Sequence, residues 1–148
     1  MRIVVQRVKE ASCTVDNKIT GEIKKGFLIF IGFKNDDTYD DMKKCLKKVV
    51  GLRIFEDENG KMNKSLSDVN GNILAISQFT LYADVKHGNR PSFIEAMGFD
   101  IASKMYDDFV QMLRNEGINV QVGIFGADMK ISLINDGPVT IIIDSESL

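Results

Sequence analysis

The sequence is poor in the side chains that enzymes most often use for acid–base and metal chemistry. It contains one histidine, two cysteines, two prolines and no tryptophan among 148 residues. Cys13 and Cys45 are too few for a disulfide scaffold or a four-thiolate zinc site. Because His87 stands alone, multi-histidine metal centres are excluded, and a Ser or Cys triad could recruit only that one imidazole as its base.

Targeting segments and nucleotide-cofactor motifs are also missing. The first ten residues already carry charges, and the longest apolar run, residues 27–33, is far below the roughly 18 residues that span a bilayer. We therefore expect a cytoplasmic protein with reduced thiols. Neither G-x-G-x-x-G nor G-x-x-x-x-G-K occurs, so the sequence predicts no cofactor, and nothing in it requires a metal.

The remaining composition is typical of one globular domain. Hydrophobic residues make up 44% of the chain and charged residues 27%, and the formal net charge is −2. No linker or repeat divides the chain, so we expect a single domain over residues 1–148. A net charge of −2 does not provide the broad basic surface that is typical of tight nucleic-acid binders. We expect neither DNA nor a membrane as a partner.

The first third of the chain is patterned as strands. Apolar and polar residues alternate over 3–8, and a turn at Asp16–Asn17 leads to a second strand over 19–23. Residues 27–33 are apolar on both faces, which predicts a central strand covered on each side.

Two later segments have helical spacing. One begins at Thr38, a capping residue with Asp41 three positions on. The other runs from Asp100 to Glu116 and stops at Gly117. The polar face of the first helix carries four lysines that we expect to be solvated: Lys43, Lys44, Lys47 and Lys48.

Short strands fill the rest of the chain and fix the fold class. They are predicted over 52–55, 72–80, 120–124, 129–135 and 139–143, with Asn-Gly turns at 59–60 and 70–71. Since strands dominate and only two helices accompany them, the sequence predicts a compact α+β domain whose sheet or open barrel is covered by the helices.

Pro138 lies between two strand-like runs, where proline is normally expelled because it cannot donate to a strand ladder. Gly137 before it tolerates almost any backbone geometry, so a cis bond that exposes main-chain groups is accessible. Only about 5–6% of X-Pro bonds in folded proteins are cis. The residues alone therefore favour a trans connecting turn.

Two segments carry polar groups that suit a site. Ser77 to Asp84 follows an aliphatic strand, and a polar strand end satisfied by backbone groups explains it equally well. Thr80 lacks a nearby base in the sequence, so it is a poor nucleophile on its own. The basic loop from Lys86 to Phe93 could grip phosphate, although solvation of a surface loop explains it more simply.

The chain closely resembles the D-aminoacyl-tRNA deacylase family, also called D-tyrosyl-tRNA deacylases, over essentially its whole length. The motifs that carry the resemblance occur in order along the chain: MRIVVQRV at 1–8, LRIFEDENGKMN at 52–63, SQFTLYAD at 77–84, KHGNRPSF at 86–93, FGADM at 125–129 and NDGPVT at 135–140. The resemblance implies a β-rich domain with helices on one side, and a homodimer with active sites at the interface. It also implies a hydrolase that cleaves the ester of D-aminoacyl-tRNA, and of glycyl-tRNA mischarged on alanine tRNA.

The resemblance further assigns roles to residues of this sequence. Gly137–Pro138 would be a Gly-cisPro element that enters the partner subunit's pocket and rejects L side chains, which reverses the preference for trans. The 2′-hydroxyl of the tRNA ribose would assist the reaction. Thr80 as nucleophile and a noncatalytic module that binds RNA ends are the alternatives. The implied catalytic residues are Ser77, Gln78, Phe79 and Thr80; the substrate-binding residues are Leu81, Phe125, Met129, Gly137, Pro138 and Arg7; the contacts to the tRNA acceptor end are Lys86, Asn89 and Arg90.

Overall fold

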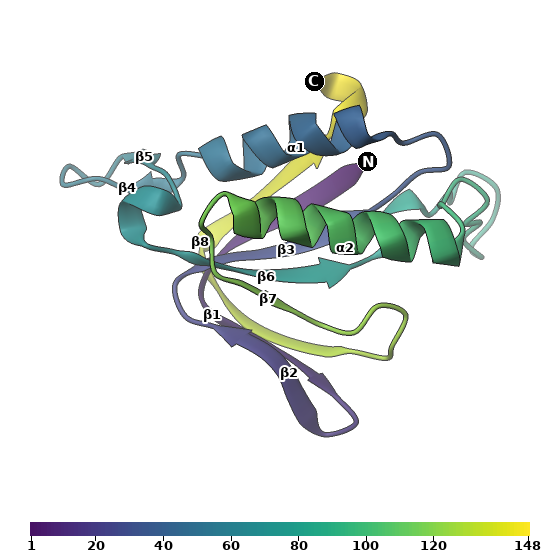
Figure 1. Ribbon diagram of the computed structural model, residues 1–148, viewed down its shortest axis with the longest axis horizontal. Coiled ribbons are helices and arrows are strands. Elements are labelled where there is room, and N and C mark those ends of the chain that lie inside the picture. Colours follow the sequence, from purple (N-terminus) through teal and green to yellow (C-terminus); the bar gives the residue numbers. More distant parts are fainter.

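The computed structural model describes residues 1–148 and has a strand-rich fold with two α-helices (Figure 1). The strands are β1 (Arg2–Val15), β2 (Lys18–Ile23), β3 (Gly26–Gly32), β4 (Phe55–Glu56), β5 (Met62–Lys64), β6 (Asn72–Ser77), β7 (Val120–Val122) and β8 (Lys130–Asp144). The helices are α1 (Tyr39–Gly51) and α2 (Phe99–Asn115). Neither helix has the length and apolar character needed to cross a membrane.

The main sheet is organised around β1. Its strand order is β2-β1-β3-β6-β7, and β8 also pairs with β1, while β4 and β5 form a separate small sheet. The pairs of β1 are antiparallel, whereas β3, β6 and β7 run parallel to one another. The sheet curls into a nearly closed barrel, and α1 and α2 lie together on one side of it (Figure 1). The predicted α+β class is confirmed.

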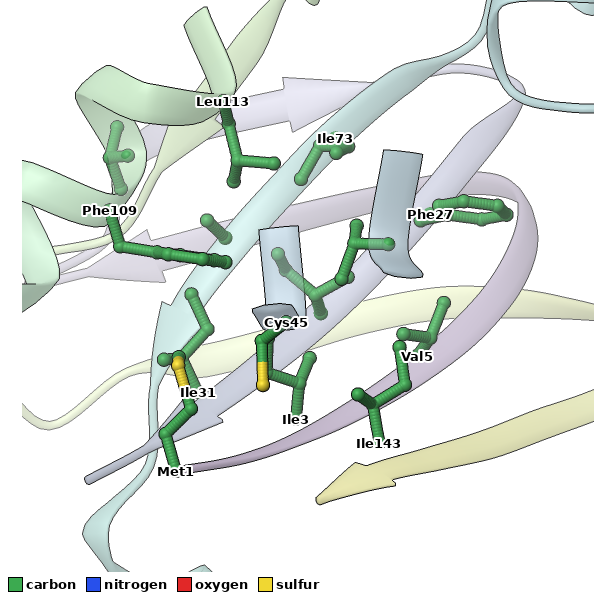
Figure 2. Close-up of a cluster of buried hydrophobic side chains, with 14 of the residues drawn as sticks. Met1, Ile3, Val5, Phe27, Ile31, Cys45, Ile73, Phe109, Leu113 and Ile143 are labelled. Atoms are coloured by element: carbon green, nitrogen blue, oxygen red, sulfur yellow. The ribbon is translucent and has the colours of Figure 1, made fainter. Parts of the chain in front are cut away.

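The larger hydrophobic core lies between the sheet and the two helices. It contains 25 buried residues, and Figure 2 shows Phe109 and Leu113 of α2 directed toward Ile73 of β6, with Phe27 of β3 and Cys45 of α1 in the same cluster. Burial raises the pKa of the Cys45 thiol to about 11. Cys45 is therefore a core residue rather than a reactive thiol.

A second, smaller core fills the inside of the curled sheet. It consists of seven buried residues: Val8, Ala11, Cys13, Ile23, Leu28, Leu74 and Ile76. Strand β3 contributes to both cores, because its successive side chains point to opposite faces. The prediction of a central strand covered on each side is thus confirmed for residues 27–33.

The first helix begins as predicted. The Thr38 side chain accepts a hydrogen bond from the Asp41 amide, and the Asp41 carboxylate accepts one from the Thr38 amide, which is a complete capping box. The Thr38 hydroxyl and the Thr38 amide both donate to the Asp41 carboxylate, and these two bonds hold the pKa of Asp41 below its usual value. The four lysines on the other face are exposed, as predicted.

Three strand predictions need correction. The strand expected over 72–80 ends at Ser77, because residues 79–82 form a 3-10 turn. The strand expected over 52–55 is the short β4 instead, and its partner β5 was not predicted. The break expected at 136–138 is absent, since β8 continues through it. Pro138 is tolerated there because the pairing of β8 with β1 shifts register between Asn135 and Thr140, which leaves no ladder bond for it to donate.

Candidate functional site

A cavity of about 590 Å³ lies at the edge of the sheet where the parallel strands end. Because β3, β6 and β7 run in one direction, the segments that follow them meet at the same edge. Phe33 comes after β3, Ser77 ends β6, and Phe125 comes after β7. The volume falls within the roughly 300–1,000 Å³ typical of small-molecule sites.

The wall of the cavity is mainly apolar and contains five phenylalanines, four of which meet in pairs. Thirteen of its 17 lining residues are hydrophobic. Phe79 and Phe93 meet edge to face with centroids 5.0 Å apart, and Phe99 and Phe125 do so at 5.1 Å. Phe79 and Phe99 are more than half exposed. Such rings suit a flat or apolar ligand group, for example a nucleobase.

Behind this wall, Tyr106 of α2 fixes the position of the aromatic pair. Its hydroxyl donates to the Ala75 carbonyl of β6 at 2.8 Å, and its ring lies 5.7 Å from that of Phe125. Burial raises the pKa of Tyr106 far above its usual value. Tyr106 therefore stays neutral and acts as a hydrogen-bond donor that ties α2 to the sheet.

Few polar side chains reach the cavity. They are Ser77, Gln78 and Asp128, and His87 is not among the lining residues. Asp128 pairs with Lys130 at 3.0 Å, but both side chains are largely exposed, so the ion pair contributes little. The cavity thus offers one carboxylate and no imidazole. No cluster of His, Cys, Asp or Glu is arranged to hold a metal ion.

The predicted residues Thr80 and Leu81 lie in the turn beside the cavity but do not line it. The exposed Thr80 hydroxyl accepts a hydrogen bond from the Gln78 side-chain amide. Because an amide does not titrate, this partner cannot take the hydroxyl proton. Of the implied catalytic and substrate-binding residues, the structure brings Ser77, Gln78, Phe79, Phe125 and Met129 together at one cavity.

Gly137, Pro138 and Arg7 lie elsewhere. The Gly137–Pro138 bond is cis, as the resemblance implied, and both residues are exposed. The middle of β8 lies near β4 and β5, whereas the tip of β6 points to the opposite end of the molecule (Figure 1). The buried Arg7 spans this region, donating to the carbonyls of Asp136 at 2.7 Å and Ile54 at 2.6 Å.

Gly137 has no room for a side chain. Its φ is +151°, and an added Cβ would lie 2.7 Å from Cγ2 of Val139 and 3.3 Å from the Arg7 guanidinium. The element is thus closely packed on the side facing its own chain, and its outer side is open to solvent.

The predicted tRNA contacts lie in an exposed loop next to the cavity. Asp84 and Ser92 exchange two backbone hydrogen bonds, of 2.8 and 2.9 Å, which close the loop that carries the contacts Lys86, Asn89 and Arg90. The chain continues from this loop into Phe93 of the cavity wall.

Among the wall residues that sequence reasoning missed are two aromatic rings and the one carboxylate: Phe93, Phe99 and Asp128. Phe93 and Asp128 lie in quoted motifs, but loops have no periodicity that assigns a direction to a side chain. Phe99 begins α2 and is exposed although it is a large apolar residue. That exposure is visible only after the fold is known.

The cavity and the sheet define an α+β protein with a mainly apolar ligand site at the ends of parallel strands. A model of the D-Tyr-tRNA(Tyr) deacylase family matches residues 4–144. The chain is 62% identical to a D-aminoacyl-tRNA deacylase of Clostridium novyi over 146 residues, covering 99% of this chain and 98% of that protein. It is 54% identical to one of Lactobacillus gasseri, covering 97% and 99%. The chain therefore belongs to the D-Tyr-tRNA(Tyr) deacylase family of hydrolases.

Two solved structures share this fold. The c-Myc DNA Unwinding Element Binding Protein superposes with a TM-score of 0.92 at 39% identity, covering 97% of this chain and 98% of that one. A probable eukaryotic D-amino acid tRNA deacylase superposes with a TM-score of 0.84 at 20% identity, covering 96% and 97%. The second likeness concerns the fold alone.

The packing of Phe99 on Gly126 can be tested by substitution. Gly126 has a φ of +76°, and an added Cβ would lie 2.5 Å from the Phe99 ring, whereas Gly88 has a φ of +85° and open space around it. Both Gly→Ala variants should lose about 1–2 kcal/mol of unfolding free energy for the backbone conformation. Gly126→Ala should lose about 0.5–1.5 kcal/mol more, because the displaced ring leaves Phe125.

Urea denaturation measures these losses. In a Phe99→Ala background the extra loss at Gly126 should disappear, since no ring remains to be displaced. Equal losses for Gly126→Ala and Gly88→Ala in the natural background would show that the ring does not depend on this glycine.

Proposed function

We propose that this protein hydrolyses the ester bond of D-aminoacyl-tRNA and releases the free D-amino acid and the tRNA. The observation that carries the proposal is the 62% identity, over 99% of the chain, to a protein named D-aminoacyl-tRNA deacylase. The cavity supports it, because aromatic walls suit the terminal adenine and an apolar amino-acid side chain. Such a reaction belongs in the cytoplasm, where tRNA is aminoacylated.

Stabilisation of the oxyanion is assigned to backbone groups. The amides of Phe79 and Thr80 begin the 3-10 turn after β6, where the first N–H groups of a helix have no partner within it. Phe79 also lines the cavity, so a substrate carbonyl there would lie near these donors. One such donor contributes about 3–4 kcal/mol in studied enzymes.

Activation of water is assigned to the substrate. The cavity lining includes no histidine, and the side chain of its one carboxylate, Asp128, is largely exposed to solvent. The ribose 2′-hydroxyl next to the ester is therefore the group best placed to assist the attack. The second candidate is Thr80 as the nucleophile. The Thr80 hydroxyl accepts a hydrogen bond from the side-chain amide of Gln78, which is not a base, and this contact weighs against Thr80 as the nucleophile.

Selection of the D hand is assigned to Gly137 and Pro138 of a second copy of the chain. Within one chain the neighbouring Asp136 is bonded to Arg7, which pairs with the start of β3, whereas the cavity lies at the end of β3. The two residues do not line the cavity of their own chain, and we assign them to a partner's pocket. Exposed apolar residues on β8 flank them and suit a homodimer interface: Leu133, Ile134 and Ile142. Arg7 holds the element through the Asp136 carbonyl.

Main-chain atoms at the substrate α-carbon would leave no space for an L side chain, so the wrong hand is rejected sterically. Glycine has no side chain and passes this check. Glycyl-tRNA mischarged on alanine tRNA is therefore a second substrate.

Contact with the tRNA is limited to its acceptor end. Lys86, Asn89 and Arg90 lie in the exposed loop beside the cavity, whereas the net charge of −2 provides no broad basic surface. Binding through so few cations is modest and depends strongly on salt concentration.

The proposed activity predicts hydrolysis of one hand only. Incubated separately with D-Tyr-tRNA and L-Tyr-tRNA, the protein should release tyrosine from the D ester well above the rate in buffer and should leave the L ester at the buffer rate. Binding of both without hydrolysis of either would favour a noncatalytic RNA-end module.

The source of the activating group can be separated from Thr80. The Thr80→Ala and Thr80→Ser variants should both deacylate D-Tyr-tRNA at a rate close to that of the natural protein. A D-Tyr-tRNA ending in 2′-deoxyadenosine, acylated at its 3′-oxygen, should react at least about 10²-fold more slowly, because general acid–base assistance contributes about 10²- to 10⁴-fold. Loss of activity in Thr80→Ala with retention in Thr80→Ser would favour the nucleophile instead.

Mixed dimers test whether the gate acts across subunits. Pro138→Gly removes the ring of the gate and should allow cleavage of L-Tyr-tRNA. Ala127→Trp fills the cavity and should be inactive, since Ala127 lines it. In a mixed dimer, the Pro138→Gly chain has the only open pocket. That pocket faces the intact Gly137–Pro138 gate of the Ala127→Trp chain.

Adding an excess of Ala127→Trp to Pro138→Gly should therefore lower cleavage of L-Tyr-tRNA while cleavage of D-Tyr-tRNA continues. Exchange of subunits is followed with two affinity tags. If mixed dimers form and cleavage of the L ester is undiminished, the gate belongs to the same chain as the pocket.

A further inference from the structure

Arg2 contacts two residues of the turn that follows β6, Leu81 and Tyr82, and one residue of β8, Asp144. One guanidinium nitrogen donates to the Leu81 carbonyl at 2.9 Å. Nε and the other nitrogen each lie 2.8 Å from Oδ2 of Asp144, near the end of β8. The guanidinium carbon also lies 5.0 Å from the centre of the Tyr82 ring. A single side chain thus connects β1, β8 and the 3-10 turn Phe79–Tyr82.

The chemistry of arginine suits this role. Its planar guanidinium can donate in two directions while its face lies on an aromatic ring, which a lysine ammonium cannot do in the same way. Partial burial raises the pKa of Asp144, but hydrogen bonds from Arg2 and from the Glu146 amide outweigh it, and the pKa lies below the usual value. Asp144 is therefore charged and fixes the guanidinium.

The other side of the turn packs on the end of β3. A Cβ on Gly32 would lie 2.9 Å from the Gln78 carbonyl oxygen and 3.1 Å from Cβ of Leu81. The backbone N–H of Gln78 also donates to the Ile31 carbonyl at 2.7 Å. The turn is thus held by backbone packing at its start and by Arg2 near its end.

We infer that Arg2, fixed by Asp144, is a positioning residue that holds the turn carrying Phe79 and Thr80 against the cavity. The inference rests on the proposed function, in which the amides of this turn stabilise the oxyanion. Arg2 does not line the cavity, so it acts through the Leu81 carbonyl rather than on the substrate. Its loss affects the reaction step more than substrate binding.

The test compares Arg2→Gln with Lys34→Gln. Lys34 makes an ion pair with Glu146 at 2.6 Å and is partly buried like Arg2, but it makes no side-chain bond to the turn. In Arg2→Gln, kcat for D-Tyr-tRNA should fall by about 10- to 100-fold with KM within about twofold, because misplacement by an ångström costs about 10²-fold. The control should keep the natural kcat.

A second readout needs no substrate. Hydrogen exchange of the amides of residues 78–83 should be faster in Arg2→Gln than in the natural protein, while exchange in α2 stays unchanged. The Lys34→Gln protein should show neither change. Faster exchange throughout the molecule would mean a general loss of stability and would overturn the inference.

Asp144→Asn completes the test. It should lower kcat in the same direction, and the double variant should be no slower than Arg2→Gln alone, because both act through one contact. Additive losses, or an unchanged kcat in Arg2→Gln, would refute the positioning role. If the natural protein fails to hydrolyse D-Tyr-tRNA, the proposed function fails, and the exchange measurement still shows whether Arg2 holds the turn.

Discussion

Both hydrophobic cores depend on the bend in one strand, β1. Its first half pairs with β3 and its second half with β2, while β8 pairs with it on both sides of the bend. Register shifts between Gln6 and Glu10 mark the bend. Val5, which precedes the bend, belongs to the core under the helices. Val8, which lies at the bend, belongs to the core inside the barrel. Residues 136–139 of β8 have no partner in β1 at these shifts, and Gly137 and Pro138 are exposed there.

The position of the cavity follows from the other half of the sheet. Parallel strands end at one edge, so three connecting segments that are distant in sequence converge there, as ligand sites in sheets with parallel strands commonly do. The antiparallel strands β1 and β8 contribute differently, since their ends supply Arg2 and Asp144 to the turn beside the cavity. The parallel strands thus bring the residues of the cavity wall together, and the antiparallel strands supply the side chains that hold the turn beside it.

The sequence predicts the parts of this structure that obey a local rule. The capping pair Thr38 and Asp41 located the first helix, and the uninterrupted apolar run over 27–33 located the central strand. The continuity of β8 through Pro138 was missed, because it depends on a register shift with β1 that no local pattern encodes. Phe99 was missed for a similar reason, since its place in the cavity wall depends on a glycine of a distant loop. Of the residues that the resemblance implied, Ser77, Gln78, Phe79, Phe125 and Met129 line the cavity, because their motifs follow the ends of the parallel strands.

The absence of Gly137 and Pro138 from this cavity has a consequence for the proposed reaction. If one chain holds the cavity and the other the Gly137–Pro138 gate, an isolated chain would have a pocket without a gate. In a two-fold pair each contact is made twice, so both pockets are closed by the same interface. Selection by main-chain atoms and assistance by the ribose need few titratable side chains. The scarcity of histidine and cysteine therefore agrees with the proposed mechanism, in which selectivity would depend on how β8 of one chain meets the cavity of the other.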